Sequence, residues 1–458
     1  MSHFVRASKY RHVYVEAPKT EACWTGLPVA TTQGEQSYIK GNTKYMAVAV
    51  QGGGGPFAVL PYNKPGRFVR GGPLVSGHTA SVLDFDFNPF HEQLVASCSE
   101  DTTVKVWGIP EDGFAETETE ALISLQGHGR KVTLLRFHPT ANNVLASVSA
   151  DMTVKLWDIE AGMNINTLSA HDQLIQDIVW DYYGNTYATS CKDKSLRIID
   201  ARSPQVAQAS HCCTFIESVA MAHEGARSSK ITYLGTKEKL VSVGFTKQSM
   251  RQFKVWDPRN LTKEIKKIDI DQAAGVILPF YDDESSLLYL AGKGDGNIRY
   301  YECVDENPWC FSISEFRSTT AAKGMAMVPK RGLNVMKCET ARLLKLTSNS
   351  IEPLSFVVPR KSDAFQDDLF PPCFSGQPSH TADEWMKGSE KAPLKMDMRP
   401  RNLGSSADPA TMAAALAKKK KAFAPLKSSK DMQKDLDAAT ARVALLEKVI
   451  KDAGLRVP

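Results

Sequence analysis

Short runs of alternating apolar and polar residues follow one another along most of the chain, and their order repeats. Residues 77–109 read GHTASVLDFDFNPFHEQLVASCSEDTTVKVWGI, and residues 127–159 read GHGRKVTLLRFHPTANNVLASVSADMTVKLWDI. In both copies Gly-His precedes an apolar strand, a turn with proline, a second strand, a turn with aspartate and a strand with a tryptophan near its end. The pattern therefore predicts a fold made of repeated units of short β-strands.

A repeat of about 40–45 residues with these features is typical of WD-repeat propeller blades. We therefore expect an all-β fold, a seven-bladed WD-repeat β-propeller, over residues 1–358. The two strong repeats become blades two and three. The fainter blades are expected at residues 37–61, 170–200, 222–257, 276–302 and 324–348, the last with strands at 324–329, 333–338 and 342–348.

The alternating segment His12–Glu16 (HVYVE) lies well before these repeats. Closed sheets avoid free edges by pairing their first and last segments. We therefore expect His12–Glu16 to be the outer strand of blade seven, where it closes the ring.

The residues that recur between blades are predicted to stabilise the fold. A histidine before the first strand, a serine in the second strand, the turn aspartate and the tryptophan can form a buried hydrogen-bond chain, because buried polar groups need partners. Ile199 and Tyr301 stand where the tryptophan would be in blades four and six. The predicted members of this network are His78, Asp101, Trp107, His128, Asp151, Trp157, His171, Asp193 and Trp256.

The strand pattern ends after Val358, and three further regions are expected. Residues 359–372 (PRKSDAFQDDLFPP) form an extension, and residues 373–430, rich in Pro, Ser, Lys and Ala, are predicted to be a linker. Residues 431–458 carry a heptad pattern that predicts a coiled-coil helix. Its a positions are Leu436, Val443 and Ile450, and its d positions are Met432, Ala439, Leu446 and Ala453.

At about three heptads this helix is too short to be stable alone, so we expect it to self-associate. Arg442 falls at a g position and Glu447 at an e position, which places them as an interchain ion pair across Val443 and Leu446. This pattern resembles a motif that specifies short parallel trimers, although alanine at two d positions leaves dimers and tetramers open. The alternative is an amphipathic helix that docks back on the propeller.

Composition and charge exclude several classes of protein. The net charge is +5, but residues 413–458 hold eleven Lys/Arg and five Asp/Glu, so the body of the chain is almost neutral and no nucleic-acid partner is expected. Nine cysteines without CxxC spacing predict a reducing compartment, hence a cytoplasmic protein without disulfides or a metal site. The N-terminus shows no secretory signal, and no apolar run approaches the roughly 20 residues that cross a bilayer.

No pattern of catalytic residues is present, and we predict no enzyme activity and no cofactor. The recurring histidines and aspartates are already assigned to the blades, and no nucleophile elbow or HExxH occurs. The run GGGG at 52–55 is not followed by GK[ST] and a helix, so we interpret it as a hairpin turn between two strands of blade one.

Several segments outside the general repeat pattern resemble the coronin family, and the resemblance covers nearly the whole chain. They are VRASKYRHVYVEAPKTEACW (5–24), SEDTTVKVWGIPEDG (99–113), CKDKSLRIID (191–200), AHEGAR (222–227), LYLAGKGDGNIRYYE (288–302), PKRGLNVMKCETAR (329–342) and PRKSDAFQDDLFP (359–371). The resemblance implies a cytoskeletal regulator of the actin-rich cortex, whose propeller binds filamentous actin and whose coiled coil makes a homo-oligomer, here a trimer or tetramer. It also implies that the tail contacts the actin-related-protein complex that nucleates branches, and that the extension packs on the underside of the propeller.

Because actin filaments are acidic, basic side chains on the propeller should attract them. The candidates are Arg6, Lys9, Arg11, Lys19, Lys192, Lys194 and Arg197, and a second contact with actin or an acidic membrane surface is expected at Lys418, Lys419, Lys420 and Lys421. The alternative is that these side chains only keep the protein soluble. Family members commonly carry a basic residue shortly after the Cys-aromatic pair, whereas here Pro28 follows Cys23-Trp24 near that place.

A different function remains open at this point. The propeller alone is also compatible with a WD-repeat adaptor in signalling or trafficking that never binds actin, because a fold does not fix a function. Co-sedimentation with filaments separates the two.

Overall fold

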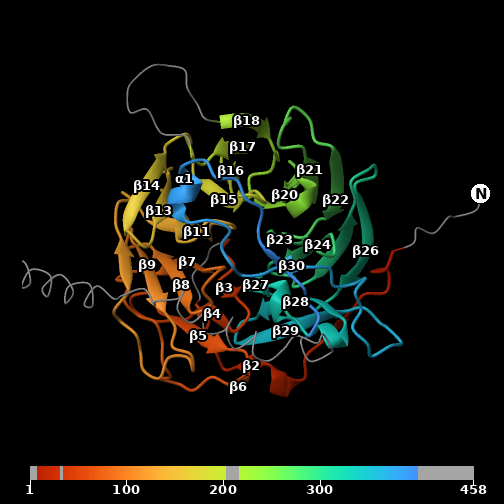
Figure 1. The fold of residues 1–458 in the computed structure, drawn as a ribbon, viewed down its shortest axis with the longest axis horizontal. Coiled ribbons are helices and arrows are strands. Elements are labelled where there is room, and N and C mark those ends of the chain that lie inside the picture. Colours follow the sequence, from red (N-terminus) through yellow and green to blue (C-terminus); the bar gives the residue numbers. More distant parts are fainter. Residues whose placement is uncertain (1–7, 31–34, 203–215, 401–458) are drawn as a thin grey trace, which may run out of the picture.

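The computed structural model describes residues 8–30, 35–202 and 216–400 of the chain. Within these ranges seven sheets stand around a central axis and form a seven-bladed β-propeller (Figure 1). The first strand of each sheet lies against the axis and the following strands lead outward, antiparallel to one another apart from one short parallel pair in blade seven.

Blade one has three strands, and blades two and three contain the two strongest repeats. Blade one comprises β3 (Ile39–Gly41), β4 (Tyr45–Ala49) and β5 (Phe57–Pro61). Blade two comprises β7 (Val82–Phe87), β8 (Leu94–Ser99), β9 (Val104–Gly108) and β10 (Ile123–Leu125). Blade three comprises β11 (Val132–Phe137), β12 (Val144–Ser149), β13 (Val154–Asp158) and β14 (Met163–Leu168).

Blades four to six have four strands each. Blade four comprises β15 (Ile175–Trp180), β16 (Thr186–Cys191), β17 (Ser195–Asp200) and β18 (Ile216–Met221). Blade five comprises β19 (Lys230–Tyr233), β20 (Leu240–Phe245), β21 (Arg251–Trp256) and β22 (Lys266–Asp271). Blade six comprises β23 (Ile277–Asp282), β24 (Leu287–Gly292), β25 (Ile298–Cys303) and β26 (Cys310–Phe316).

Blade seven joins the two ends of the propeller. Its strands β27 (Gly324–Met327), β28 (Glu339–Leu346) and β29 (Ser350–Val357) are completed by β1 (Tyr14–Glu16) and β2 (Trp24–Thr25), which both pair with β29. The short strand β6 (Gly66–Arg67) then pairs with β2 in parallel. The N-terminal segment thus closes the ring by pairing with β29, the last strand of blade seven.

The blades are held together by apolar packing between their faces. In β8 and β12 every side chain is buried, because these second strands are covered on both faces by neighbouring blades. The first strands β7 and β11 instead have two half-buried side chains each, and those of Asp86 and Arg136 line the central cavity. Trp107, Trp157 and Trp256 are almost completely buried between blades.

Charged side chains link blades around the central channel, a cavity of about 300 Å³. Arg136 of blade three forms ion pairs with Asp84 of blade two at 3.0 Å and with Asp177 of blade four at 3.1 Å. The Asp84 carboxylate also accepts a hydrogen bond from the backbone N–H of Leu135, and that of Asp177 from Ile231. Each aspartate therefore ties its own blade to the next.

One expected strand of blade seven is absent. Residues 333–338 were expected to be extended, but they contain the 3₁₀ turn η4 (Val335–Lys337), capped by the Asn334 side chain and ended by Cys338 at φ 54°. The second and third strands are β28 and β29 instead. The alternation in LNVMKC arises from a turn that buries Val335, not from a strand.

The chain after blade seven remains packed up to residue 400, so the expected linker boundary at 373 is wrong. It forms β30 (Cys373–Phe374), α1 (Ala382–Met386) and β31 (Lys395–Met396). In Figure 1 this segment, drawn in blue, crosses one side of the propeller toward blades three and four. Cys373 and Trp385 are completely buried there. The shorter stretch 359–372 contributes Leu369 and Phe370 to the core of blades six and seven.

Candidate functional site

The predicted polar network is complete in blades two and three. In blade two the His78 Nδ1 atom lies 2.8 Å from Asp101 Oδ2, and Nε2 lies 2.8 Å from the Ser97 hydroxyl, which also accepts a hydrogen bond from the Trp107 indole at 2.8 Å. Burial lowers the pKa of His78. Burial opposes ionisation of Asp101, but hydrogen bonds from Thr103 and from His78 outweigh it and lower the pKa of its carboxyl group. A neutral imidazole and an ionised carboxylate therefore suit this chain of bonds.

Blade three repeats the arrangement. His128 lies 3.0 Å from Asp151 and 2.7 Å from the Ser147 hydroxyl, to which Trp157 donates a hydrogen bond at 2.8 Å. Hydrogen bonds from Thr153 and Gly129 overcome burial and lower the pKa of Asp151 to about 2. These groups connect three strands of one blade, and nothing in their geometry leaves a reactive atom exposed.

Blades four and five depart from the pattern. His171 bonds the Thr189 hydroxyl at 2.9 Å through Nε2, while its buried Nδ1 has no hydrogen-bond partner among the described residues. The expected partner, Asp193, instead forms an ion pair with Arg197 at 2.6 Å. The network expected between His171 and Asp193 is therefore not formed. The Asp193 carboxylate is paired instead with the guanidinium of Arg197, four residues further along the chain.

In blade five the tryptophan keeps its role but the aspartate is replaced. Trp256 donates a hydrogen bond to the Ser242 hydroxyl at 2.8 Å, and His223 bonds the same hydroxyl at 2.9 Å. Gln252, which stands in the register of Thr103 in blade two, takes over the contact of the aspartate and lies 3.0 Å from His223 Nδ1. A neutral amide can replace the carboxylate at this contact, because the contact consists of one hydrogen bond with the imidazole ring.

The basic candidates are divided between two faces of the propeller. We define the extension face by the loops between first and second strands, which include Phe90, Thr140 and Gly184, and the opposite face by the loops between second and third strands. Lys192 and Lys194 are exposed in the β16–β17 turn of the opposite face, where the Lys194 ammonium donates a hydrogen bond to the Glu224 carbonyl at 2.7 Å.

The N-terminal candidates lie elsewhere. Lys9 bonds the carbonyl oxygen of Asp368 in the C-terminal extension, Arg11 is exposed two residues further on, and Lys19 is exposed at the rim of blade seven. Arg197 is only 8% exposed and is paired with Asp193, so it is removed from the set of accessible contacts. Arg6 lies outside the described residues, as do Lys418, Lys419, Lys420 and Lys421 and the heptad residues Leu436, Arg442, Val443, Leu446, Glu447 and Ile450.

The extension face is occupied by the chain's own C-terminal segment. Phe374 packs edge-on against Phe90 of blade two, with 6.0 Å between ring centroids. The His380 ring lies 3.1 Å from the Thr140 hydroxyl of blade three, and the Trp385 indole donates a hydrogen bond to the Gly184 carbonyl of blade four at 3.2 Å. This segment therefore covers part of the extension face, at blades two, three and four.

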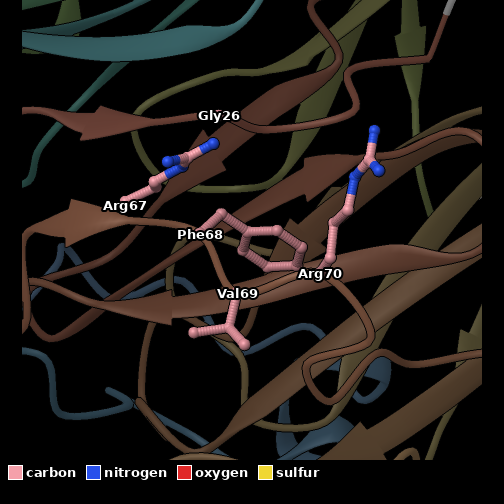
Figure 2. Close-up of a pocket in the computed structure, with 5 residues that line it drawn as sticks. All are labelled: Gly26, Arg67, Phe68, Val69 and Arg70. Atoms are coloured by element: carbon pink, nitrogen blue, oxygen red, sulfur yellow. The ribbon is translucent and has the colours of Figure 1, made fainter.

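A basic hollow at the rim was missed by the sequence analysis. It is lined by Gly26, Arg67, Phe68, Val69 and Arg70, at the seam between blades seven and one (Figure 2). The sequence signal is the segment GRFVR (66–70), in which two arginines flank two apolar residues. This segment lies between the predicted blades and has no repeat pattern. Pro28, near the family's basic position, is exposed and its carbonyl accepts a hydrogen bond from Gln51 at 2.7 Å.

Neither a metal-binding cluster nor a membrane-spanning helix occurs in the described part of the chain. No group of three or more His, Cys, Asp or Glu side chains there could hold a metal ion. None of the helices in those ranges is long and apolar enough to cross a membrane. The cysteines of these ranges are buried free thiols.

Comparisons with known proteins agree with this architecture. Residues 71–108, 119–158 and 162–200 match the family model of the WD domain, G-beta repeat, residues 351–393 match a type of WD40 repeat, and residues 3–67 match a domain of unknown function, DUF1899. Coronin-A of Dictyostelium discoideum is 43% identical over 468 residues, covering 100% of this chain and 99% of that protein. Coronin-2B of Homo sapiens is 42% identical over 397 residues, covering 86% of this chain and 80% of that protein.

A solved structure is similar as well. The WD40 domain from Toxoplasma gondii coronin superposes with a TM-score of 0.79 at 32% sequence identity, and the match covers 85% of this chain and 98% of that chain. Both the repeats and the segments that flank them are thus shared with these relatives.

Proposed function

The chain belongs to the coronin family, and we propose that it binds actin filaments through its propeller and organises the actin cytoskeleton. The observation that carries this proposal is the identity with Coronin-A at 43% along the full chain, because it includes the flanks that general WD-repeat proteins lack. Among the described residues the polar clusters serve the fold, which leaves binding, not catalysis, as the role of the surface.

The free surface suits a filament as partner. The C-terminal segment covers part of the extension face, so the filament contact falls to the opposite face and to the rim. Lys192 and Lys194 on the opposite face and Lys19 on the rim are exposed and carry charge opposite to that of an acidic polymer. Lys9 and Arg11 lie beside the extension and are weaker candidates for the filament contact.

We further propose that residues 431–458 assemble a trimer or tetramer, as their heptad pattern indicates. Several propellers on one stalk would bind a polymer with an effective affinity well above that of one propeller, and could cross-link filaments. Lys418–Lys421 would add a basic contact with actin or an acidic membrane surface. A contact with the branch-nucleating complex and a place in the actin-rich cortex belong to the same proposal.

Co-sedimentation with actin filaments tests this function. The full chain should pellet with filaments at moderate salt, and the chain ending at Lys430 should pellet less, since it loses the predicted coiled coil but keeps the closed propeller. Sedimentation equilibrium of the two proteins provides the control, because only the full chain should exceed the mass of a monomer. A full chain that stays in the supernatant would rule out filament binding and favour the adaptor role.

A further inference from the structure

The rim hollow is built on a rigid support. The chain leaves blade one after β5 and joins blade seven as β6, where the Gly66 N–H donates to the Cys23 carbonyl at 3.0 Å and the Phe68 N–H donates to the Thr25 carbonyl at 2.8 Å. The Phe68 ring is half-buried and packs against the apolar core of blades seven and one. The backbone of residues 66–68 is thus fixed on both sides of Arg67.

The two arginine side chains of this segment have no partner among the described residues. Arg67 and Arg70 are both exposed, and neither guanidinium has a hydrogen bond or an ion pair with any described residue. Arg136, Arg251 and Arg342 of the propeller are all paired with carboxylates. Because an arginine that stabilises the fold is normally satisfied within it, the two rim arginines are free for an external anion.

The apolar residue between them is also unusual. Val69 is 72% exposed, the largest exposed fraction among the large hydrophobic side chains of the described residues. Figure 2 shows the two arginines on either side of the Phe68 ring, with Val69 projecting from the same short segment. Exposed apolar surface rimmed by charge is typical of a protein-binding site.

Gly26 forms the floor of the hollow. Its φ is +73°, and a Cβ atom there would lie 3.4 Å from Arg67 Cγ and 4.0 Å from the Phe68 carbonyl oxygen. The glycine therefore provides the left-handed turn and keeps the space beside the Arg67 stem open.

We propose that Arg67 and Arg70, with Val69 between them, form a docking site for an acidic segment of the actin filament surface. The proposal rests on the filament-binding function and specifies where on the propeller it occurs. The two guanidiniums can each donate two parallel hydrogen bonds to a carboxylate, and Val69 supplies apolar contact between these pairs. A protein surface with paired acidic residues fits this arrangement better than an isolated phosphate, because the exposed valine would gain nothing from the latter.

The test uses the full chain and charge-reversed variants. Arg67→Glu/Arg70→Glu should lower the affinity for filaments in co-sedimentation by about tenfold or more, as expected for close charge pairs at an interface. Arg67→Lys/Arg70→Lys keeps the charge but loses the fork, and should fall between this variant and the original protein. The matched control is Lys263→Glu/Lys387→Glu, an equal change of charge at two exposed residues away from the hollow, which should bind filaments within about twofold of the original.

The outcomes separate the site from the function. If the original protein pellets and the Arg67→Glu/Arg70→Glu variant pellets equally well, the docking site is wrong while the function stands. If the variant loses binding to vesicles with acidic phospholipid but not to filaments, the site belongs to membranes and the proposal also fails. If the original protein does not pellet, the proposed function fails first. Circular dichroism and thermal unfolding should show unchanged folding, since the substituted side chains are exposed.

Discussion

Trp385 of the C-terminal segment, residues 373–400, packs against His138 of blade three, with 4.7 Å between the ring centroids and both side chains completely buried. Both rings donate a hydrogen bond to one acceptor, the Gly184 carbonyl of blade four, at 2.8 Å from His138 and 3.2 Å from Trp385. The C-terminal segment therefore joins blades three and four, although it follows blade seven in the chain.

Removing this anchor should release the extension. Trp385→Ala should lower the free energy of unfolding by about 3–5 kcal/mol, because it opens a large cavity and leaves the Gly184 carbonyl with one bond fewer. Limited proteolysis should then cut within residues 373–400 faster than in the original protein. Met386→Ala changes the next, exposed residue and should leave both measurements unchanged; equal protection of the two variants would contradict the anchor.

Arg136 should be more important for stability than surface ion pairs. Arg136→Ala leaves the carboxylates of Asp84 and Asp177 without their cation in the central channel, and should cost about 2–3 kcal/mol in denaturant unfolding. Lys131→Ala removes the exposed pair with Glu100 and should cost less than about 1 kcal/mol. Equal costs would show that the channel pairs do not link the blades.

The network of blade three should show the cost of an unsatisfied buried group. Ser147→Ala removes the hydroxyl shared by His128 and Trp157, and should destabilise the protein by about 1–3 kcal/mol. Ser124→Ala alters an exposed serine of β10 and serves as the comparison. A Ser147→Ala protein as stable as that comparison would mean that the network does not hold the blade.

Acid should weaken the propeller through its buried histidines. Burial, and then the Arg197 charge, lower the pKa of His171 from the ordinary value of 6.5 to about 4. The unfolded chain therefore binds the proton more readily, so the stabilisation from His171 is complete above about pH 6.5 and is lost as the pH falls toward 4. His138 and His223, with pKa values lowered by burial to about 3, act in the same direction.

The variant His171→Gln isolates one of these contributions. Between pH 7.5 and 5 it should lose about 2 kcal/mol less unfolding free energy than the original protein. Asp181 and Glu284, whose pKa values burial raises to about 6 and about 7, titrate oppositely in both proteins and cancel in the comparison. A pH dependence of unfolding in His171→Gln identical to that of the original protein would disprove the assignment.

The sequence predicted the propeller because its strongest signals are local. Second strands such as β8 and β12 are short, fully buried runs of apolar residues and serine, and in blades two and three the Gly-His and tryptophan positions recur at the same offset. Even the tryptophan substitutes keep their register: Ile199 pairs with Tyr187 and Tyr301 with Leu288, as Trp107 does with Val95.

The errors arose where partners are distant in sequence. Residues 373–400 have the composition of a linker, yet Trp385 packs against loops of blades three and four. The only local sequence signal for α1 is the capping box of Thr381 and Glu384. Asp193 was assigned to His171 from its repeat position, whereas a nearby arginine competes for it. The rim hollow depends on β6 joining a different blade from β5, which no periodicity reveals.

The most direct test of the central claim is a cryo-electron-microscopy reconstruction of actin filaments decorated with the full chain. We predict regular decoration, with the seam of blades seven and one, around Arg67 and Arg70, against the filament and the extension face directed away from it. Filaments that remain bare at saturating protein, or propellers that meet actin through the extension face around Phe374 and Trp385, would contradict it.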